Sequence, residues 1–233
     1  MKSGGMPVRY FAIGTSPRVS MRHPDIDPSL VLAWQVAHSI ARGSPPPVHD
    51  RGGFRVDTGS QTETKRWIFP RLGDGVRAIA REIAAPRHFM KVCVSDQELR
   101  DALPVHWEVE PPGFFMTTAM PAGEMKPLPE GYRMQLAHAW PVTRVHIIAP
   151  DGSEAASGCA AETPDVFIYD RIATAPDHRR KGLGVAVMTA LGSERKSAVS
   201  QQLLAATEEG RKLYQMLGWT VIAPLATAVT PEE

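Results

Sequence analysis

The heptapeptide HRRKGLG, from His178 to Gly184, places three permanent cations and two glycines directly before a predicted helix. That helix is indicated by Leu183, Val187 and Leu191, which recur at i, i+4 and i+8 as an apolar stripe. Helix starts favour negative charge, because the free N–H groups and the macrodipole are positive there. Each cation in this place costs about 0.3–1 kcal/mol unless an anion lies between the side chains and the amides. The segment therefore predicts an anion-binding site.

Two common glycine-rich phosphate motifs do not fit this segment. A P-loop ends in Gly-Lys-Ser/Thr, whereas Gly184 is followed by Val185. The dinucleotide fingerprint needs a third small residue where Val187 stands. What remains is Arg179-x-x-Gly182-x-Gly184, whose glycines let the backbone approach a ligand and aim successive N–H groups outward. This geometry suits a pyrophosphate; a glycine-permitted turn with a solvated basic patch is the alternative.

Two motifs of the chain resemble those of the GNAT superfamily of acyl-CoA-dependent N-acyltransferases. RRKGLG, which follows the strand-like FIYDRIAT, is similar to the family's Arg/Gln-x-x-Gly-x-Gly/Ala turn, whose amides bind the pyrophosphate of coenzyme A. LYQMLGW, from Leu213 to Trp219, is similar to the family's Leu-Tyr-x-x-x-Gly-Phe/Trp. The resemblance extends from about Thr143 to Thr220. It implies a GNAT-like fold and transfer of an acyl group to an amine.

The resemblance also implies where the pantetheine arm of acetyl-CoA binds. The amides of Ile172 and Thr174, at the end of the fourth family strand, would pair with it as with an extra strand. Strand alternation predicts that these two residues and Asp170 share one side, with Arg171 and Ala173 on the other.

The pyrophosphate would bind the amides of Arg180 to Gly184, with the basic side chains beside them as favourable neighbours. Thr207 stands where many family members have an asparagine that contacts pantetheine, and it can still cap the helix that follows. The predicted coenzyme-binding residues are Ile172, Ala173, Thr174, Arg179, Arg180, Lys181, Gly182, Leu183, Gly184 and Thr207.

Acylation of an amine needs a base for the amine proton and an acid for the departing thiolate. By the resemblance, Tyr214 is the acid, and a phenol in that role contributes roughly 10²–10⁴-fold. Asp170 is the predicted base, although it could equally be the structural partner of an arginine. Glu162 and His146 on the neighbouring hairpin are alternatives, and a water chain could serve instead of a side chain.

We predict no metal site. His23, Asp25 and Asp27 are explained more simply by alternating prolines and a helix cap. Cys93 and Cys159 lack the paired spacing of zinc ligands and are predicted to be reduced core residues.

The first half of the chain has to supply elements beyond the two motifs. Asp27-Pro28 caps a helix that ends near Gly43, and Ser95 with Glu98 forms a capping box. The remaining pattern predicts a hairpin at 54–59 and 64–69, a helix at 76–83, a strand at 88–94 and a helix at 96–103. Residues 104–129 are rich in proline and aromatic residues and are predicted to form an ordered connector that buries Trp107, Phe114 and Phe115.

The second half alternates more regularly. Strands are predicted at 132–137, 143–150, 154–162, 165–174, 201–207 and 219–229, with a hairpin turn at Asp151-Gly152 and helices near 183–193 and 208–217. The fold class is therefore α/β, in an α+β arrangement with a mixed sheet covered by helices on both faces. We expect an N-terminal α/β extension over residues 1–130, which could be a degenerate GNAT-like half, and the GNAT catalytic domain over residues 131–233.

Composition limits the partners. A net charge of +1 over 233 residues predicts neither nucleic-acid nor membrane binding, and no apolar run is long enough for a spanning helix or a signal peptide. We expect a cytoplasmic N-acetyltransferase that uses acetyl-CoA and a small-molecule amine, without a metal. The alternatives are a peptide or protein acceptor and a non-catalytic acyl-CoA-binding module. The sequence leaves open whether the protein is a monomer or a homodimer.

Overall fold

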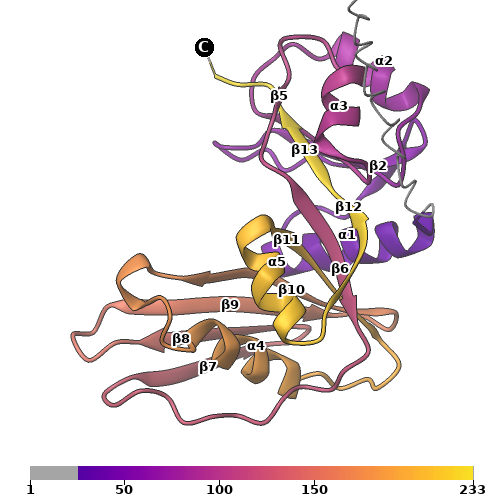
Figure 1. The fold of residues 1–233 in the computed structure, drawn as a ribbon. Coiled ribbons are helices and arrows are strands. Elements are labelled where there is room, and N and C mark those ends of the chain that lie inside the picture. The colour runs from indigo at the N-terminus through magenta and orange to yellow at the C-terminus, as the bar shows by residue number, and fades with distance from the viewer. Residues whose placement is uncertain (1–25, 233) are drawn as a thin grey trace, which may run out of the picture.

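The computed structural model describes residues 26–232, which form two β-sheets with helices packed on them (Figure 1). In chain order the elements are α1 (Pro28–Arg42), β1 (Val48–Asp50), β2 (Gly53–Val56), β3 (Lys65–Phe69), α2 (Asp74–Glu82), β4 (His88–Val92), α3 (Asp96–Ala102), β5 (Glu108–Val109), β6 (Gly113–Thr118), β7 (Arg133–Ala139), β8 (Val142–Ile148), β9 (Glu154–Glu162), β10 (Val166–Thr174), the 3-10 turn η1 (Pro176–His178), α4 (Leu183–Ser193), β11 (Gln201–Thr207), α5 (Glu208–Met216), β12 (Thr220–Pro224) and β13 (Ala226–Val229).

The larger sheet has seven strands in the order β12-β6-β11-β10-β9-β8-β7. Only β10 and β11 are parallel within it, and every other neighbouring pair is antiparallel. Helix α4 packs on β8, β9 and β10, and α1 packs on β9 and β10 from the opposite face. The side chains of β10 alternate between the two hydrophobic cores on the faces of this sheet. Tyr169 packs in the core under α4, and Ile168 packs in the core under α1.

The smaller sheet has six strands in the order β1-β2-β3-β4-β13-β5, and it lies in the upper part of Figure 1. Strands β3 and β4 are parallel and are joined through α2. Trp67, Val76 and Leu99 are buried in the core that α2 and α3 share with this sheet.

The two sheets exchange strands across the boundary expected near residue 130. Strand β6 comes from the first half of the chain, yet it lies between β11 and β12 in the larger sheet. Strand β13 comes from the end of the chain, yet it lies between β4 and β5 in the smaller sheet. Figure 1 shows the consecutive strands β12 and β13 leading from one sheet to the other.

Two sequence predictions need correction for this reason. The segment at 104–129 is not only a connector, because it contains β5 and the internal strand β6. Trp107 and Phe115 are buried as expected, and Phe114 is partly buried. The single strand expected at 219–229 is two strands in different sheets, divided at the buried Leu225. A continuous apolar run does not reveal where a chain changes its pairing partner.

Predictions that rest on short-range hydrogen bonds are confirmed. The Asp27 carboxylate accepts from Ser29 N at the start of α1, and Gly43 ends that helix with a φ of 63°. Ser95 and Glu98 form the capping box of α3. The hairpin of β2 and β3 and the turn at Asp151-Gly152 are present, with Gly152 at a φ of 88°.

Both cysteines are free thiols, and Cys159 is buried whereas Cys93 is partly exposed. Burial raises the pKa of the Cys159 thiol to about 11, with a further contribution from the charge of Asp170. Among the helices that the structure describes, none combines the length and apolar character needed to cross a membrane.

Candidate functional site

Strands β10 and β11 separate at the end of the larger sheet. Their parallel pairing runs from Val166 with Gln201 to Tyr169 with Leu204 and does not continue. Beyond that point β11 stays paired with β6, and β10 stays paired with β9. The β11 side of residues 170–174 in β10 is therefore free of any strand among the described residues, and its main-chain groups can pair with an extended ligand.

A β-bulge in β10 lies at this point of separation. Asp170 pairs with Cys159 and Ala173 with Ser157, so one extra residue is inserted in β10, and Arg171 has a left-handed φ of 54°. The bulge reverses the alternation that the sequence predicts, and the expectation that Asp170 shares a side with Ile172 is wrong. Asp170 faces α1, where its carboxylate contacts Arg42, whereas Ile172 packs in the cluster under α4.

The turn before α4 has the free amides that the sequence predicts. Gly182 is the N-cap of α4 with a φ of 79°, no side chain caps the helix, and its first turn contains no acidic residue. Within residues 26–232, no main-chain acceptor or side chain outside the helix receives a hydrogen bond from the amides of Arg180 to Gly184. Free donors at a helix N-terminus and the helix dipole together favour an anion.

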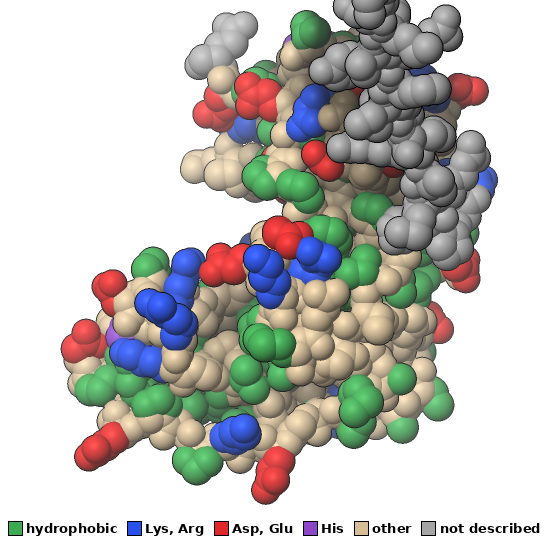
Figure 2. Space-filling view, in the orientation of Figure 1, with side chains coloured by type: hydrophobic (Ala, Val, Ile, Leu, Met, Phe, Trp, Pro, Cys, Tyr) green, Lys and Arg blue, Asp and Glu red, His purple; other side chains and the backbone are tan. Residues whose placement is uncertain are grey.

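The basic side chains of this turn lie mostly on the surface. Lys181 Nζ donates to Tyr132 Oη at 2.8 Å, and the same oxygen lies 2.8 Å from His178 Nδ1. Arg179 forms an ion pair with Glu209 at 3.6 Å, with both side chains exposed, and pairs of this kind contribute little to stability. Figure 2 shows Lys and Arg side chains gathered on this part of the surface, beside the hollow between the two sheets. These cations remain able to contact an anion bound at the turn.

The turn before α4, the end of β10 and helix α5 meet at Gly184. A Cβ added at Gly184 would lie 3.3 Å from Leu213 Cδ2 and 3.6 Å from Thr174 Oγ1. Thr207 caps α5, because its hydroxyl accepts from Gly210 N at 3.2 Å, as the sequence predicts. The free edge of β10, the free amides of α4 and the start of α5 therefore meet at one end of the larger sheet.

Tyr214, the predicted acid, lies on α5 at this end and is only 6% exposed. Its ring packs near Trp219, with ring centroids 6.2 Å apart, and its hydroxyl has no hydrogen-bond partner among residues 26–232. Burial raises the pKa of this phenol to about 12, and the negative charge of Asp170 adds to the shift. The phenol is therefore protonated at neutral pH and can donate a proton to a ligand.

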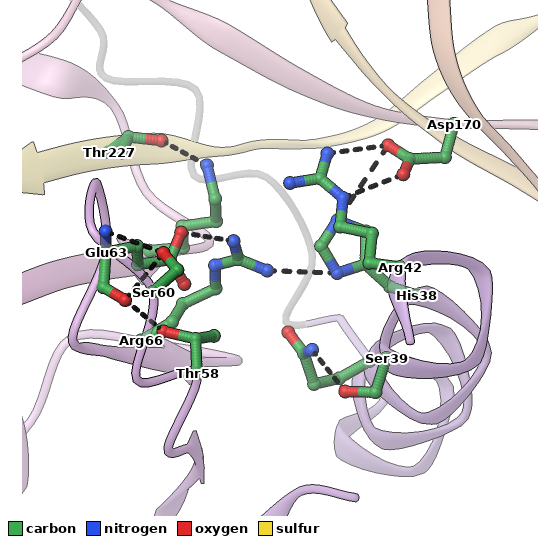
Figure 3. Close-up of polar contacts among 11 residues, drawn as sticks. His38, Ser39, Arg42, Thr58, Ser60, Glu63, Arg66, Asp170 and Thr227 are labelled. Carbon is green, nitrogen blue, oxygen red and sulfur yellow. Dashed lines mark hydrogen bonds and ion pairs between the residues drawn. The ribbon is translucent and has the colours of Figure 1, made fainter. Parts of the chain in front are cut away.

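Asp170, the predicted base, is held by Arg42 through two hydrogen bonds of 2.8 Å, Nε to Oδ2 and Nη2 to Oδ1 (Figure 3). Its Oδ1 also lies 3.8 Å from His38 Nε2. Both carboxylate oxygens are thus occupied by charge-assisted hydrogen bonds, so a proton arriving at Asp170 would have to compete with Arg42.

The alternative bases lie elsewhere in the larger sheet. Glu162 pairs with Phe167 near the beginning of β10, and its carboxylate accepts from the amides of Lys196 and Ser197. His146 lies on β8, and its Nδ1 contacts Glu154 on the surface. Neither side chain reaches the separation of β10 and β11.

The structure adds a polar cluster that the sequence patterns do not reveal. A cavity of about 220 Å³ opens between the two sheets, and its lining includes Asp170 of β10, Ala205 of β11, His38 of α1, Arg66 of β3 and Lys91 of β4. The only local signal is on α1, where the buried face carries Gln35, His38 and Ser39 instead of apolar residues alone.

His38 is a neutral histidine at the centre of this cluster. Arg66 Nη1 lies 3.0 Å from its Nδ1, and because a guanidinium only donates, Nδ1 is the acceptor and Nε2 carries the proton. Burial, followed by the charges of Arg42 and Arg66, holds the pKa of His38 well below its usual value. Arg66 in turn contacts the Glu63 carboxylate, so that charged and polar groups form a continuous chain from Asp170 to Glu63 (Figure 3).

No group of three or more His, Cys, Asp or Glu side chains in the described part of the chain is arranged to hold a metal ion. Asp27 caps α1, while His23 and Asp25 lie outside the described residues.

Comparison with known proteins gives one family and one fold. Residues 142–221 match the model of the acetyltransferase (GNAT) domain. A GCN5-related N-acetyltransferase from Kribbella flavida superimposes with a TM-score of 0.58 and 13% identity, covering 88% of this chain and 96% of that one. A putative GNAT acetyltransferase from Novosphingobium aromaticivorans superimposes with a TM-score of 0.56 and 14% identity, covering 89% of this chain and 100% of that one.

A tandem GNAT protein from the clavulanic acid biosynthesis pathway is also similar, with a TM-score of 0.51 and 12% identity over 78% of this chain and 79% of that one. No curated protein matches the sequence. The predicted GNAT resemblance and the mixed α/β GNAT fold are confirmed.

Proposed function

Because residues 142–221 match the model of the GNAT acetyltransferase domain, we propose that the protein transfers an acetyl group from acetyl-CoA to the amine of a small molecule in a ternary complex. The observation that carries this proposal is the junction of a free strand edge with a helix N-terminus. The edge begins where β10 leaves β11, and the helix is α4, whose first amides have no partner among the described residues.

Main-chain groups would provide most of the coenzyme contacts. The amides of Ile172 and Thr174, with Ala173 between them, would pair with pantetheine along the free edge of β10. The amides from Arg180 to Gly184 would receive the pyrophosphate, since they combine free donors with the positive end of α4. The side chains of Arg179, Arg180 and Lys181 would add charge-assisted contacts. Thr207 would contribute indirectly, by fixing the start of α5.

The proposed chemical step uses a proton donor and a proton acceptor on opposite sides of the thioester. The lone pair of the neutral amine attacks the thioester carbonyl, a C–N bond forms, and the C–S bond of the tetrahedral intermediate breaks. Tyr214 gives its proton to the departing sulfur, which the raised pKa of this phenol permits at neutral pH. The proton released by the amine passes to Asp170, directly or through water, in competition with the Arg42 pair.

The size of the cavity favours a small-molecule acceptor over a peptide or protein. Asp170 and Ala205, which flank the separation of β10 and β11, both line this cavity of about 220 Å³. A peptide or protein would instead need an open groove leading to the thioester. A cytoplasmic location would suit the two free cysteines and the supply of acetyl-CoA.

Two measurements on matched proteins test the proposal. Isothermal titration calorimetry with acetyl-CoA should give saturable binding to the unaltered protein and to Tyr214→Phe, because the coenzyme is held mainly by the backbone. Release of free coenzyme A should be measured with amino acids, polyamines, aminoglycosides and peptides. Tyr214→Phe should lower kcat by roughly 10²-fold or more, since it removes only the proton donor.

Each alternative has its own outcome. Absence of acetyl-CoA binding would refute the proposed function. Binding without acylation of any amine would favour an acyl-CoA-binding module. Unchanged kcat in Tyr214→Phe would remove Tyr214 from the mechanism and leave the transfer itself intact.

A further inference from the structure

The cavity between the two sheets lies on the acceptor side of the proposed thioester site. Ala205 lies two residues after Leu203 in β11, so both side chains are on the same face of the sheet, and Leu203 packs in the cluster that contains α1. Asp170 contacts Arg42 of α1 directly. The cavity therefore opens on the α1 face of the larger sheet, whereas the turn before α4 lies on the other face. An amine in the cavity would approach the gap between β10 and β11 from the side opposite the coenzyme pyrophosphate.

Most charges of the cavity are already neutralised by neighbours. Asp170 is held by Arg42 through two hydrogen bonds, and Arg66 contacts Glu63. Lys91 and Glu110 are the exceptions, because neither side chain forms an ion pair within the described part of the chain, and Lys91 Nζ donates only to Thr227 Oγ1 at 2.8 Å. Lys91 is therefore the cation of the cavity that lacks an ion-pair partner among the described residues.

The surroundings of Lys91 are electrostatically unfavourable to its charge. The pKa of Lys91 is lowered to about 8, mainly by burial and then by the positive charges of Arg66 and Arg42, while the negative charges of Glu110 and Glu63 partly oppose the shift. The amine is still mostly protonated at pH 7. A negative group placed beside it would relieve the repulsion among the three cations.

The cavity wall also contains buried polar atoms that the protein leaves unsatisfied. Trp34 Nε1, Glu63 Oε1 and Arg66 Nε have no hydrogen-bond partner among the described residues. Trp34 is 2% exposed and Arg66 is 5% exposed. These three atoms are shielded from solvent and do not themselves face a guest, but they belong to polar side chains that line the cavity, which makes the cavity unsuited to a purely apolar molecule.

We propose that the acceptor is a small amino acid-like molecule, whose carboxylate binds the ammonium group of Lys91 while its amine lies at the gap between β10 and β11 beside Asp170. This inference rests on the proposed acetyl transfer and specifies its substrate class. Lys91 is then a specificity-determining residue that comes from the first half of the chain.

The charge balance favours a singly charged carboxylate over a phosphate dianion. Glu63, Glu110 and Asp170 also line the cavity, so a second negative charge on the ligand would be repelled. An acceptor amine without a carboxylate would not form an ion pair with Lys91. The loss of this interaction should lower the affinity about tenfold or more.

The first experiment compares matched acceptors with the unaltered protein. For alanine and phenylalanine, kcat/KM for coenzyme A release is measured at pH 7 beside that of the corresponding carboxamides and decarboxylated amines. The carboxamides have the size of the acids without the charge. Each amino acid should exceed its carboxamide and its amine by at least about tenfold.

The second experiment assigns this preference to Lys91. Lys91→Met keeps most of the length of the side chain and removes the charge, so it should lower kcat/KM for the amino acids about tenfold or more and affect the carboxamides much less. Thr227→Val is the matched control, because it removes the hydrogen-bond partner of Lys91 and keeps the ammonium group. It should preserve the preference for the acids.

The outcomes separate this inference from the proposed function. Carboxamides or amines that react as well as the acids, or a Lys91→Met change that affects all three classes alike, would overturn the inference and leave acetyl transfer standing. If Lys91→Met does not fold, the acceptor comparison with the unaltered protein still decides. If the protein bound no acetyl-CoA, both the inference about the acceptor and the proposed function would be refuted.

Discussion

His38 is a buried neutral histidine held between two charged neighbours. It is 3% exposed, stacks on Trp34 with ring centroids 4.7 Å apart, accepts from Arg66 and directs Nε2 toward Asp170. Protonation would place a fourth positive charge beside Arg42, Arg66 and Lys91 in the same cavity. The cluster is therefore compatible with only one protonation state of this ring.

The linkage between folding and protonation of His38 gives a prediction for pH dependence. The pKa of His38 is lowered in the folded protein, so between that value and the unfolded value of about 6.5 the unfolded chain binds more protons. The contribution to stability is complete above pH 6.5 and is lost as the pH falls. We expect the free energy of unfolding in urea to decrease by up to about 1.4 kcal/mol per pH unit between pH 6.5 and 5.

His38→Gln provides the control for this prediction, because an amide does not titrate in that range. The slope between pH 6.5 and 5 should be much smaller in the variant. An equal slope in both proteins would assign the pH dependence to other groups.

At the scale of elements, the β-bulge in β10 organises the site. It lies where the pairing of β10 with β11 ends, next to the free edge that we assign to the coenzyme in the proposal, and it places Ile172 on the α4 face while Asp170 keeps the α1 face of Ile168. The left-handed φ of 54° at Arg171 is the local conformation that makes this possible. The two substrates can thus approach the same gap from opposite faces of one sheet.

Arg171 allows the bulge to be tested with a matched pair of substitutions. Arg171→Gly and Arg171→Val both remove an exposed guanidinium, but only glycine accepts a positive φ without strain. We expect the valine variant to be less stable than the glycine variant by about 1–2 kcal/mol in urea denaturation. Equal stability would mean that the bulge does not constrain this residue.

At the scale of the whole molecule, strand exchange makes the two sheets interdependent. The larger sheet needs β6 from the first half, and the smaller sheet needs β13 from the end of the chain. The α1 face of the larger sheet is also covered by the first half. The division into residues 1–130 and 131–233 stays a prediction, and the strand exchange leads us to expect that neither part folds alone.

A fragment experiment tests this interdependence. Residues 131–233 lack β6 and α1, so Leu203 and Ile168 would lose the neighbours that bury them. We expect the isolated fragment to show no cooperative thermal unfolding by circular dichroism and no acetyl-CoA binding by calorimetry. Co-expression with residues 26–130 should restore both. A fragment that unfolds cooperatively and binds acetyl-CoA would contradict the prediction.

The sequence by itself determined the features that depend on a few neighbouring residues. The caps at Asp27 and Ser95, the glycine turn before α4 and the cap at Thr207 follow from hydrogen bonds and backbone angles within about one turn of chain. The two family motifs lie on such features, which is why the sequence leads to a candidate coenzyme site at the turn before α4. The position of Tyr214 on α5 belongs to this group.

The tertiary structure alone decided which strands pair and which charges meet. Strand alternation carries no information about the partner, so the places of β6 and β13 were not predictable, and one inserted residue in β10 put Ile172 on the opposite side from Asp170. Arg42, Lys91 and Asp170 lie far apart in the chain, and they face one cavity only because two sheets pack against each other. Electrostatic interactions depend on distance in space, and sequence separation does not supply that distance.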